Sequence, residues 1–218
     1  TNTIWFTHFK CLKNLCHNGK KILDKWVERD VMNNPLPVYD EKNQLVEGAV
    51  KIKNTDDYLM TYSGGGNSIG EFAAKYPGTL GNSITISMAD SAVFSTWDYK
   101  GQFDSAPGTS PYATNVGGSS DEMHIIIIDS VGTISGAPGT VLEKFAFVSK
   151  ANDGKRSDGT NNYYKDVINS RSEYIYWMDH PATVTDWGTA AAGNTFETIA
   201  TAVTRSLSGG VDDLTATD

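Results

Sequence analysis

Four residues near the N-terminus are of the types that bind zinc. His8, Cys11, Cys16 and His17 lie within one short stretch. Structural zinc sites place two ligand pairs well apart, whereas these four form one cluster. In a helix, Cys11 and Cys16 would also point about 140° apart. We therefore interpret the cysteines as ordinary thiols, and expect neither a metal nor a cofactor.

Two further clusters place a carboxylate beside a histidine, as general base chemistry requires. Asp179 precedes His180, and Asp121 and Glu122 lie just before His124. No G-x-S-x-G nucleophile motif accompanies either pair. We interpret both histidines as structural, and predict no catalytic residue and no enzyme activity.

A mixed-charge segment follows in the second half of the chain. Its basic residues alternate with acidic ones in the order Lys150, Asp153, Lys155, Arg156, Asp158, Lys165 and Asp166. Such a segment can simply be solvated, or it can orient a protein partner through complementary charges. The residues alone leave both interpretations open.

The elements that flank this segment can be predicted from their patterns. Val141–Ser149 alternates in the manner of a strand, and 151–162 is a polar loop with two Asp-Gly turns. A short helix over Tyr163–Arg171 and an aromatic strand over Glu173–Trp177 follow. The charged residues should therefore lie between a strand and a helix.

The run MHIIIID, Met123–Asp129, is the strongest strand pattern in the chain. Four consecutive isoleucines indicate burial on both faces, and hence a central strand. The turn over Ser130–Pro138 is short, so this strand should lie beside Val141–Ser149.

The remaining elements define the fold class. We expect helices at Asn54–Tyr62, with Asn54 as N-cap, and at Thr195–Arg205, a helical turn at Ile69–Lys75, strands at Ser83–Met88 and Val93–Tyr99, and an irregular loop over Phe103–Ser120. Helices interleaved with strands predict an α+β fold, with α/β as the alternative. The prediction is one mixed β-sheet with a central four-isoleucine strand, flanking helices and long irregular loops.

The first part of the chain is separate in pattern. Residues 10–32 carry an apolar stripe at helical spacing, and Pro35 and Pro37 end it. We predict an N-terminal helical element over 1–34 and a main domain over 35–218.

Charge and composition exclude several function classes. The 218 residues carry a net charge of −8, and residues after position 30 hold 12 basic against 23 acidic side chains. An acidic surface without a basic stripe argues against nucleic acid as a partner. The chain contains no run of 18 apolar residues, so the sequence does not predict membrane insertion. Two cysteines are too few for a disulfide framework, as expected for a protein made in a reducing cytosol.

Three motifs occur in an order that indicates a family. The first is GTVLE followed by GTNNYYKDVIN-x-RS within residues 139–177, the second is Tyr76-Pro77-Gly78 with Leu80-Gly81-Asn82-Ser83, and the third is SLSGGV at Ser206–Val211. In this order they resemble the tail sheath protein of contractile-tailed, T4-like bacteriophages. The resemblance spans residues of about 50 to 211, with a variable loop at about 89–121, and suggests that the chain is an internal fragment.

The resemblance implies a structural and mechanical function. Sheath subunits stack as hexameric rings around a tail tube, and contraction drives the tube through the host envelope. Implied partners are other sheath subunits and the tail tube, baseplate and neck proteins. The implied location is the virion tail, with assembly in the host cytoplasm. On this interpretation the candidate subunit contacts are Lys150, Lys155, Arg156, Asp158 and Lys165.

A carbohydrate-binding or adhesin module is the alternative, because the loops are rich in Ser, Thr, Asn and Gly and the chain has five Trp. Sugar-binding sites need exposed aromatic platforms, whereas we expect Tyr174, Tyr176 and Trp177 to be largely buried. A hydrolase ranks third.

Overall fold

The computed structural model describes residues 50, 52–66 and 70–212. The chain divides into two units, residues 1–50 and 51–218, and every element described below belongs to the second. The N-terminal helical element and the cluster from His8 to His17 lie outside the described residues. The domain boundary after residue 34 stays a prediction.

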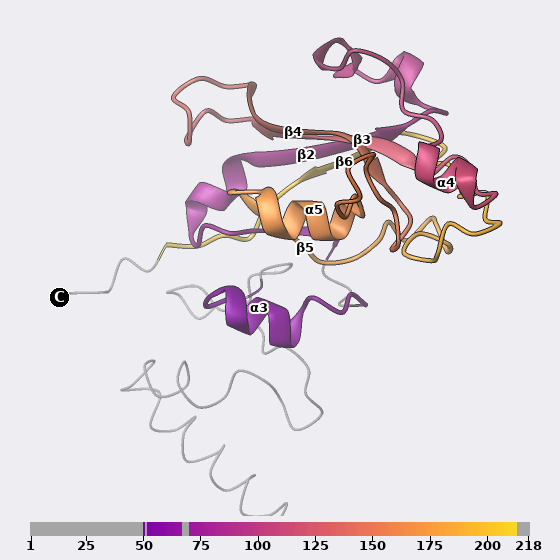
Figure 1. The fold of residues 1–218 in the computed structure, drawn as a ribbon. Helices are drawn as coiled ribbons and strands as arrows, with labels where there is room; N and C mark the ends of the chain where they lie inside the picture. The colour runs from indigo at the N-terminus through magenta and orange to yellow at the C-terminus, as the bar shows by residue number, and fades with distance from the viewer. Residues whose placement is uncertain (1–49, 51, 67–69, 213–218) are drawn as a thin grey trace, which may run out of the picture. The chain divides into compact units, whose positions relative to one another are not determined.

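A four-stranded antiparallel sheet holds the core (Figure 1). Its order is β4-β3-β2-β6, where β2 is Ile84–Asp90, β3 is Glu122–Asp129, β4 is Thr140–Ser149 and β6 is Val203–Ser206. The four-isoleucine strand β3 is central and buried, and it pairs with β4 as predicted. The α+β class is confirmed, but the described sheets are antiparallel rather than mixed.

A second, two-stranded sheet pairs β1, Phe72–Ala74, with β5, Ile175–Trp177. The predicted strand over Glu173–Trp177 is thus confirmed in its last three residues. The helical turn expected at Ile69–Lys75 is wrong. Residues 72–74 are extended instead, because their backbone pairs with β5, a contact distant in sequence and invisible to local pattern.

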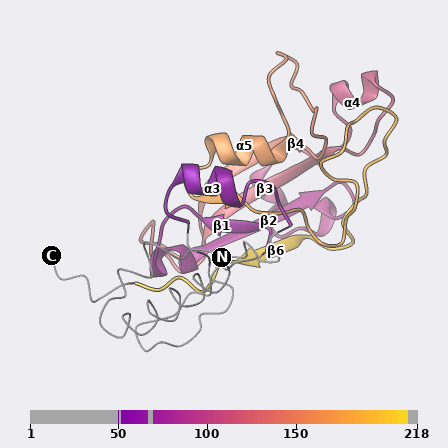
Figure 2. The ribbon, with the colours of Figure 1, turned by 90° about the horizontal axis from the view of Figure 1, so that it is seen from below.

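The described part of the chain also contains three short α-helices. In α3, Thr55–Thr61, the Asn54 side chain caps the helix by accepting a hydrogen bond from the Asp57 N–H, as predicted. The predicted second helix is confirmed as α5, Tyr164–Arg171, which packs against β4 and β5. Figures 1 and 2 show α5 and the small sheet on one face of the four-stranded sheet. Helix α4, Pro111–Asn115, lies in the segment expected to be irregular.

Two further predicted elements were wrong. In place of a strand at Val93–Tyr99, the chain forms the 3-10 helices η2, Phe94–Thr96, and η3, Lys100–Gln102. In place of a helix at Thr195–Arg205, residues 195–202 are irregular and β6 follows. The backbone there bonds to other segments, since the N–H of Phe196 donates to the carbonyl of Ser119. A third 3-10 helix, η1, covers Thr79–Ser83.

Strand β4 is irregular, and this changes which of its side chains are buried. Its pairing with β3 shifts register twice, and Phe147 has a φ of 53°. The simple alternation expected along Val141–Ser149 is therefore interrupted, and Phe145 and Val148 are its buried apolar residues. Adjacent side chains still point to opposite faces: Lys144 reaches the carbonyl of Gln102, whereas Glu143 accepts a hydrogen bond from Ser172, just after α5.

Candidate functional site

Lys150, predicted on the surface, is buried and fully bonded. Its ammonium group donates to Asp90 Oδ2 at 2.9 Å, to the carbonyl of Ser120 at 3.1 Å and to the carbonyl of Glu197 at 3.0 Å. It also lies 4.9 Å from the centre of the Trp187 ring. Burial lowers the lysine pKa, against the opposing effect of Asp90. Lys150 therefore bonds segments of the domain to each other in the interior. This corrects its assignment as a subunit-contact residue.

Lys155, Arg156 and Asp158 lie together on an exposed turn. The N–H of Arg156 donates to the carbonyl of Thr160 at 3.0 Å, which closes the turn. Asp158 Oδ1 accepts from the N–H of Thr160 at 2.9 Å and from its hydroxyl at 2.6 Å, and these bonds lower the aspartate pKa. The Asp158 carboxylate thus shapes the turn. Lys155 and Arg156 are exposed, and their role as contacts stays a prediction.

A hollow of about 390 Å³ separates this turn from α5. Arg156 lines it from the turn, and Arg171, in the last turn of α5, lines it from the helix. The Nε of Arg156 donates to Asn162 Oδ1 at 3.0 Å. Arg171 forms no ion pair with any residue that the structure describes. Two arginines therefore line one hollow, with Asp166 beside them, and a pair of guanidinium groups can bind a carboxylate.

The other residues that line the hollow are Thr160, Asn161, Asp166, Val167 and Ser170, of which Val167 is apolar. Asn161 donates from Nδ2 to Asp166 Oδ2 at 2.7 Å, and Thr160 and Ser170 add hydroxyl groups. Sequence reasoning missed Arg171, because nothing in the local pattern showed that the end of the predicted helix lies beside the charged loop.

Lys165 does not line this hollow. Its ammonium group lies 4.3 Å from the centre of the Trp177 ring, a cation–π contact on another side of α5. Of the five predicted contact residues, only Arg156 therefore borders the hollow. Lys155 and Asp158 are on the same turn.

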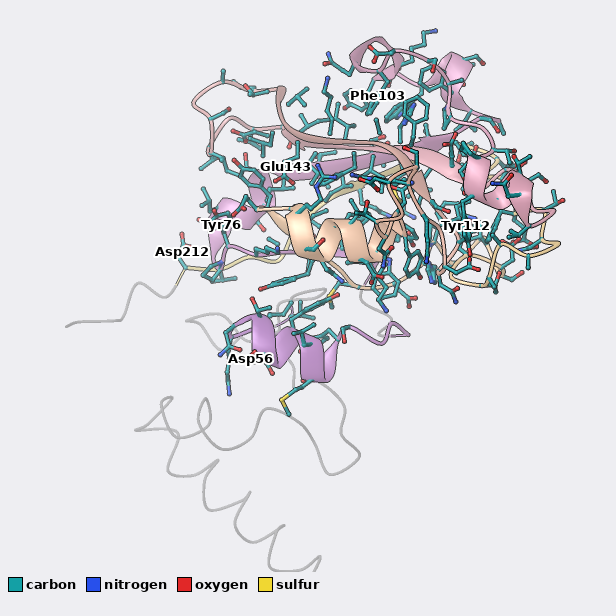
Figure 3. The ribbon with its side chains drawn as sticks, in the orientation of Figure 1. Asp56, Tyr76, Phe103, Tyr112, Glu143 and Asp212 are labelled. Carbon is teal, nitrogen blue, oxygen red and sulfur yellow. The ribbon has the colours of Figure 1, made fainter. Side chains whose placement is uncertain are left out.

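His124 is a buried structural residue. Its Nδ1 accepts a hydrogen bond from the N–H of Phe147 at 3.1 Å, so the ring proton is on Nε2, which donates to the carbonyl of Ser105 at 2.8 Å. The ring stacks on Phe103 at 4.3 Å with an interplanar angle of 4°. Figure 3 labels Phe103 on the segment above the sheet. Burial lowers the histidine pKa.

The carboxylates that neighbour the two histidines in sequence form hydrogen bonds with groups other than the histidine rings. Asp121 accepts hydrogen bonds from Ser110 and Ser149. Asp179 accepts from the backbone N–H groups of Gly66 and His180, while the His180 ring bonds to tyrosine hydroxyls. Neither arrangement is that of a carboxylate orienting a general base. Across residues 50–212, where described, no cluster of three His, Cys, Asp or Glu could hold a metal.

The lowered histidine pKa values predict loss of stability in mild acid. Burial lowers the pKa of both His124 and His180, so the unfolded chain binds more protons below its ordinary histidine pKa, and stability falls as pH falls. We expect the melting temperature to drop from about pH 7 to about pH 5. His124→Asn, which keeps an acceptor but does not titrate, should show a smaller drop. Equal drops in both proteins would contradict this assignment.

The aromatic residues considered for sugar binding are largely interior. Tyr176 is 7% and Trp177 is 1% exposed. The Tyr58 ring stacks on Tyr176 with centroids 4.3 Å apart, and its hydroxyl donates to the Trp177 carbonyl. Tyr174 is half-buried against Tyr76. This strand therefore presents no aromatic platform, and a carbohydrate-binding function is not favoured.

Comparison with known proteins points to a phage tail. The chain is 35% identical over 118 residues to the tail sheath protein of Salmonella phage ViI. The aligned part is 53% of this chain and 16% of that protein, so the chain spans well under two thirds of its relative. No protein-family model matches. The similarity relates this chain to tail sheath proteins and supports a structural role in a phage tail virion.

No helix in the described ranges has both the length and the apolar character that crossing a bilayer requires.

Proposed function

We propose that this chain is a rigid domain of a contractile tail sheath subunit of the T4-like type. The complete subunits form hexameric rings around the tail tube, and contraction drives the tube through the host envelope. The partners are neighbouring subunits and the tube, baseplate and neck proteins, without nucleic acid or membrane insertion. The protein acts in the virion tail after assembly in the host cytoplasm, and it is not an enzyme.

The similarity to a tail sheath protein carries this proposal. The structure supports it physically, because a contracting lattice needs bodies that keep their shape while their contacts change. Here, buried hydrogen bonds fix even the irregular segments: Asp90 accepts from Lys150 and from the N–H of Ile199. The exposed charged turn at Lys155 and Arg156 then offers contacts that can exchange.

The direct test is electron microscopy of the complete subunit that contains this sequence. We expect purified subunits, or lysates of infected cells, to contain tubes with a helical or ring-stacked repeat. Labelling of intact virions with an antibody against this domain should decorate the tail. Monomers at every concentration tested, with no label on tails, would refute the proposed function.

Charge reversal on the exposed turn tests the predicted contact residues. We expect Lys155→Glu with Arg156→Glu to leave the isolated chain folded, with a loss of unfolding free energy of about 1 kcal/mol, because both residues are exposed and only the hydrogen bond from Arg156 to Asn162 is lost. The same change in the complete subunit should impair tube formation or contraction. Lys155→Arg with Arg156→Lys preserves the charge and is the control. Normal, contractile tubes from the reversed variant would show that the turn is only solvated.

A further inference from the structure

The segment 91–107 lies on the face of the four-stranded sheet opposite to α5. Lys144, which points to one face of β4, bonds to Gln102 in this segment, whereas its neighbour Glu143 bonds beyond the end of α5. Figure 1 shows the segment with η2 and η3 above the sheet and α5 below it. The segment and the arginine-lined hollow therefore belong to opposite sides of the domain.

Aromatic contacts hold this segment in place. Trp97 is 3% exposed and donates from Nε1 to the hydroxyl of Ser87 at 2.8 Å. Phe103 stacks on the buried His124 and lies 5.3 Å from the Trp97 ring. A segment anchored in this way loses little conformational freedom on binding, so its outer side chains are prearranged for a partner.

Two carboxylates on the outside of this segment lack partners. Asp98 and Asp104 are both exposed, and neither forms a hydrogen bond or ion pair with the described residues. The carboxylates of Asp56 and Glu173 are likewise exposed without such a partner, whereas Asp158 is engaged with Thr160 and Asp212 with Thr79. The domain thus has two unpaired carboxylates on one side and the guanidinium groups of Arg156 and Arg171 on the other.

We propose that Asp98 and Asp104 of one subunit dock at the Arg156–Arg171 hollow of a second copy of this chain. The inference rests on the proposed function, because it identifies which surfaces of the sheath subunit meet. Carboxylate and guanidinium groups form strong, often bidentate, charge-assisted hydrogen bonds. The Asp166 carboxylate beside the hollow would repel a doubly charged phosphate more than a single carboxylate, which favours an aspartate as occupant.

The placement of the two surfaces determines the type of assembly. Because they differ and lie on opposite faces, each subunit that docks leaves its own second surface open. Such head-to-tail contacts continue into rings or helical stacks, whereas a contact between identical patches would stop at a dimer. Two different surfaces on separate sides of the subunit are therefore compatible with a repeating sheath contact.

Two complementary charge reversals in the complete subunit test the contact. Variant A carries Asp98→Lys and Asp104→Lys, and variant B carries Arg156→Glu and Arg171→Glu. Each alone should reduce the assembled fraction, measured by sedimentation and electron microscopy, by about tenfold or more, because like charges then meet. An equal mixture of A and B should recover assembly, since the lysines of A face the glutamates of B and the aspartates of B face the arginines of A.

The controls separate this inference from the proposed function. Asp56→Lys, at an exposed carboxylate on α3, should assemble like the unmodified subunit, and all variants should melt near its temperature. Normal assembly of A or B, or failure of their mixture to recover, would overturn the contact and leave the sheath function standing. Absence of tubes from the unmodified subunit would refute the function instead. In that case, a disulfide between copies carrying Asp98→Cys and Arg171→Cys, mapped by mass spectrometry, still decides the contact: its formation supports the contact and its absence overturns it.

Discussion

Replacing Lys150 by methionine should lower the free energy of unfolding by about 3–5 kcal/mol, the cost of breaking a buried ion pair on one side. The Asp90 carboxylate would keep its backbone donors, the N–H groups of Ala92 and Ile199, but lose its cation. The carbonyls of Ser120 and Glu197 would each lose a donor. Methionine retains most of the apolar stem, so the loss reports on the ammonium group. Urea unfolding followed by tryptophan fluorescence measures it.

Lys155→Met is the matched control for this prediction, because Lys155 lies on the same segment but is exposed. It should change stability by about 0.5 kcal/mol or less. A double variant, Lys150→Met with Asp90→Leu, should recover part of the loss, since neither charge then remains unpaired. A loss below about 1 kcal/mol in Lys150→Met would show that the buried ion pair contributes little.

Truncation of the central strand should have an effect of similar size. Ile127 is fully buried in β3 and stands between Ile86 of β2 and Glu143 of β4. Ile127→Ala removes buried methyl and methylene groups and leaves a cavity, which should cost about 2–5 kcal/mol. The same unfolding experiment gives the value.

The control for the strand is Val131→Ala, just after β3, where the side chain is 62% exposed. It should be nearly neutral. If Ile127→Ala were equally neutral, the strand would not be part of a close-packed core, contrary to its position between two neighbours.

Strong local signals in the sequence predicted the parts of the fold that they control. Four isoleucines placed β3 at the centre, and a short turn placed β4 beside it. Asn54, followed by acidic residues, indicated α3 and its cap correctly. In each case, the residues that determine the element lie within it or next to it, so pattern alone was sufficient.

The failures occur where distant contacts override local preference. The alanines near residue 200 favour a helix. This segment is irregular instead, because its N–H groups bond to other segments: Ile199 donates to Asp90 of β2, and Phe196 donates to the carbonyl of Ser119, which follows α4. Residues 72–74 became a strand only because β5 was there to pair with. No local pattern contains that information.

The candidate site was likewise predicted only where local pattern was sufficient. The exposed turn at Lys155, Arg156 and Asp158 was identified from charge pattern. The burial of Lys150 was missed, because its partner Asp90 is 60 residues away along the chain. A signal was available in outline: one strand ends in an aspartate and another is followed directly by a lysine. Their pairing, however, depends on strand order, which the sequence did not reveal.

The irregularity of β4 has a consequence for solubility. β4 is an edge strand of the four-stranded sheet, and exposed edge strands are where separate chains can pair and aggregate. Its two register shifts, and the left-handed backbone at Phe147, interrupt the row of N–H and C=O groups that another strand would need. The exposed edge of β4 is therefore a poor template for a strand of another chain, which lowers the tendency of copies to aggregate along it.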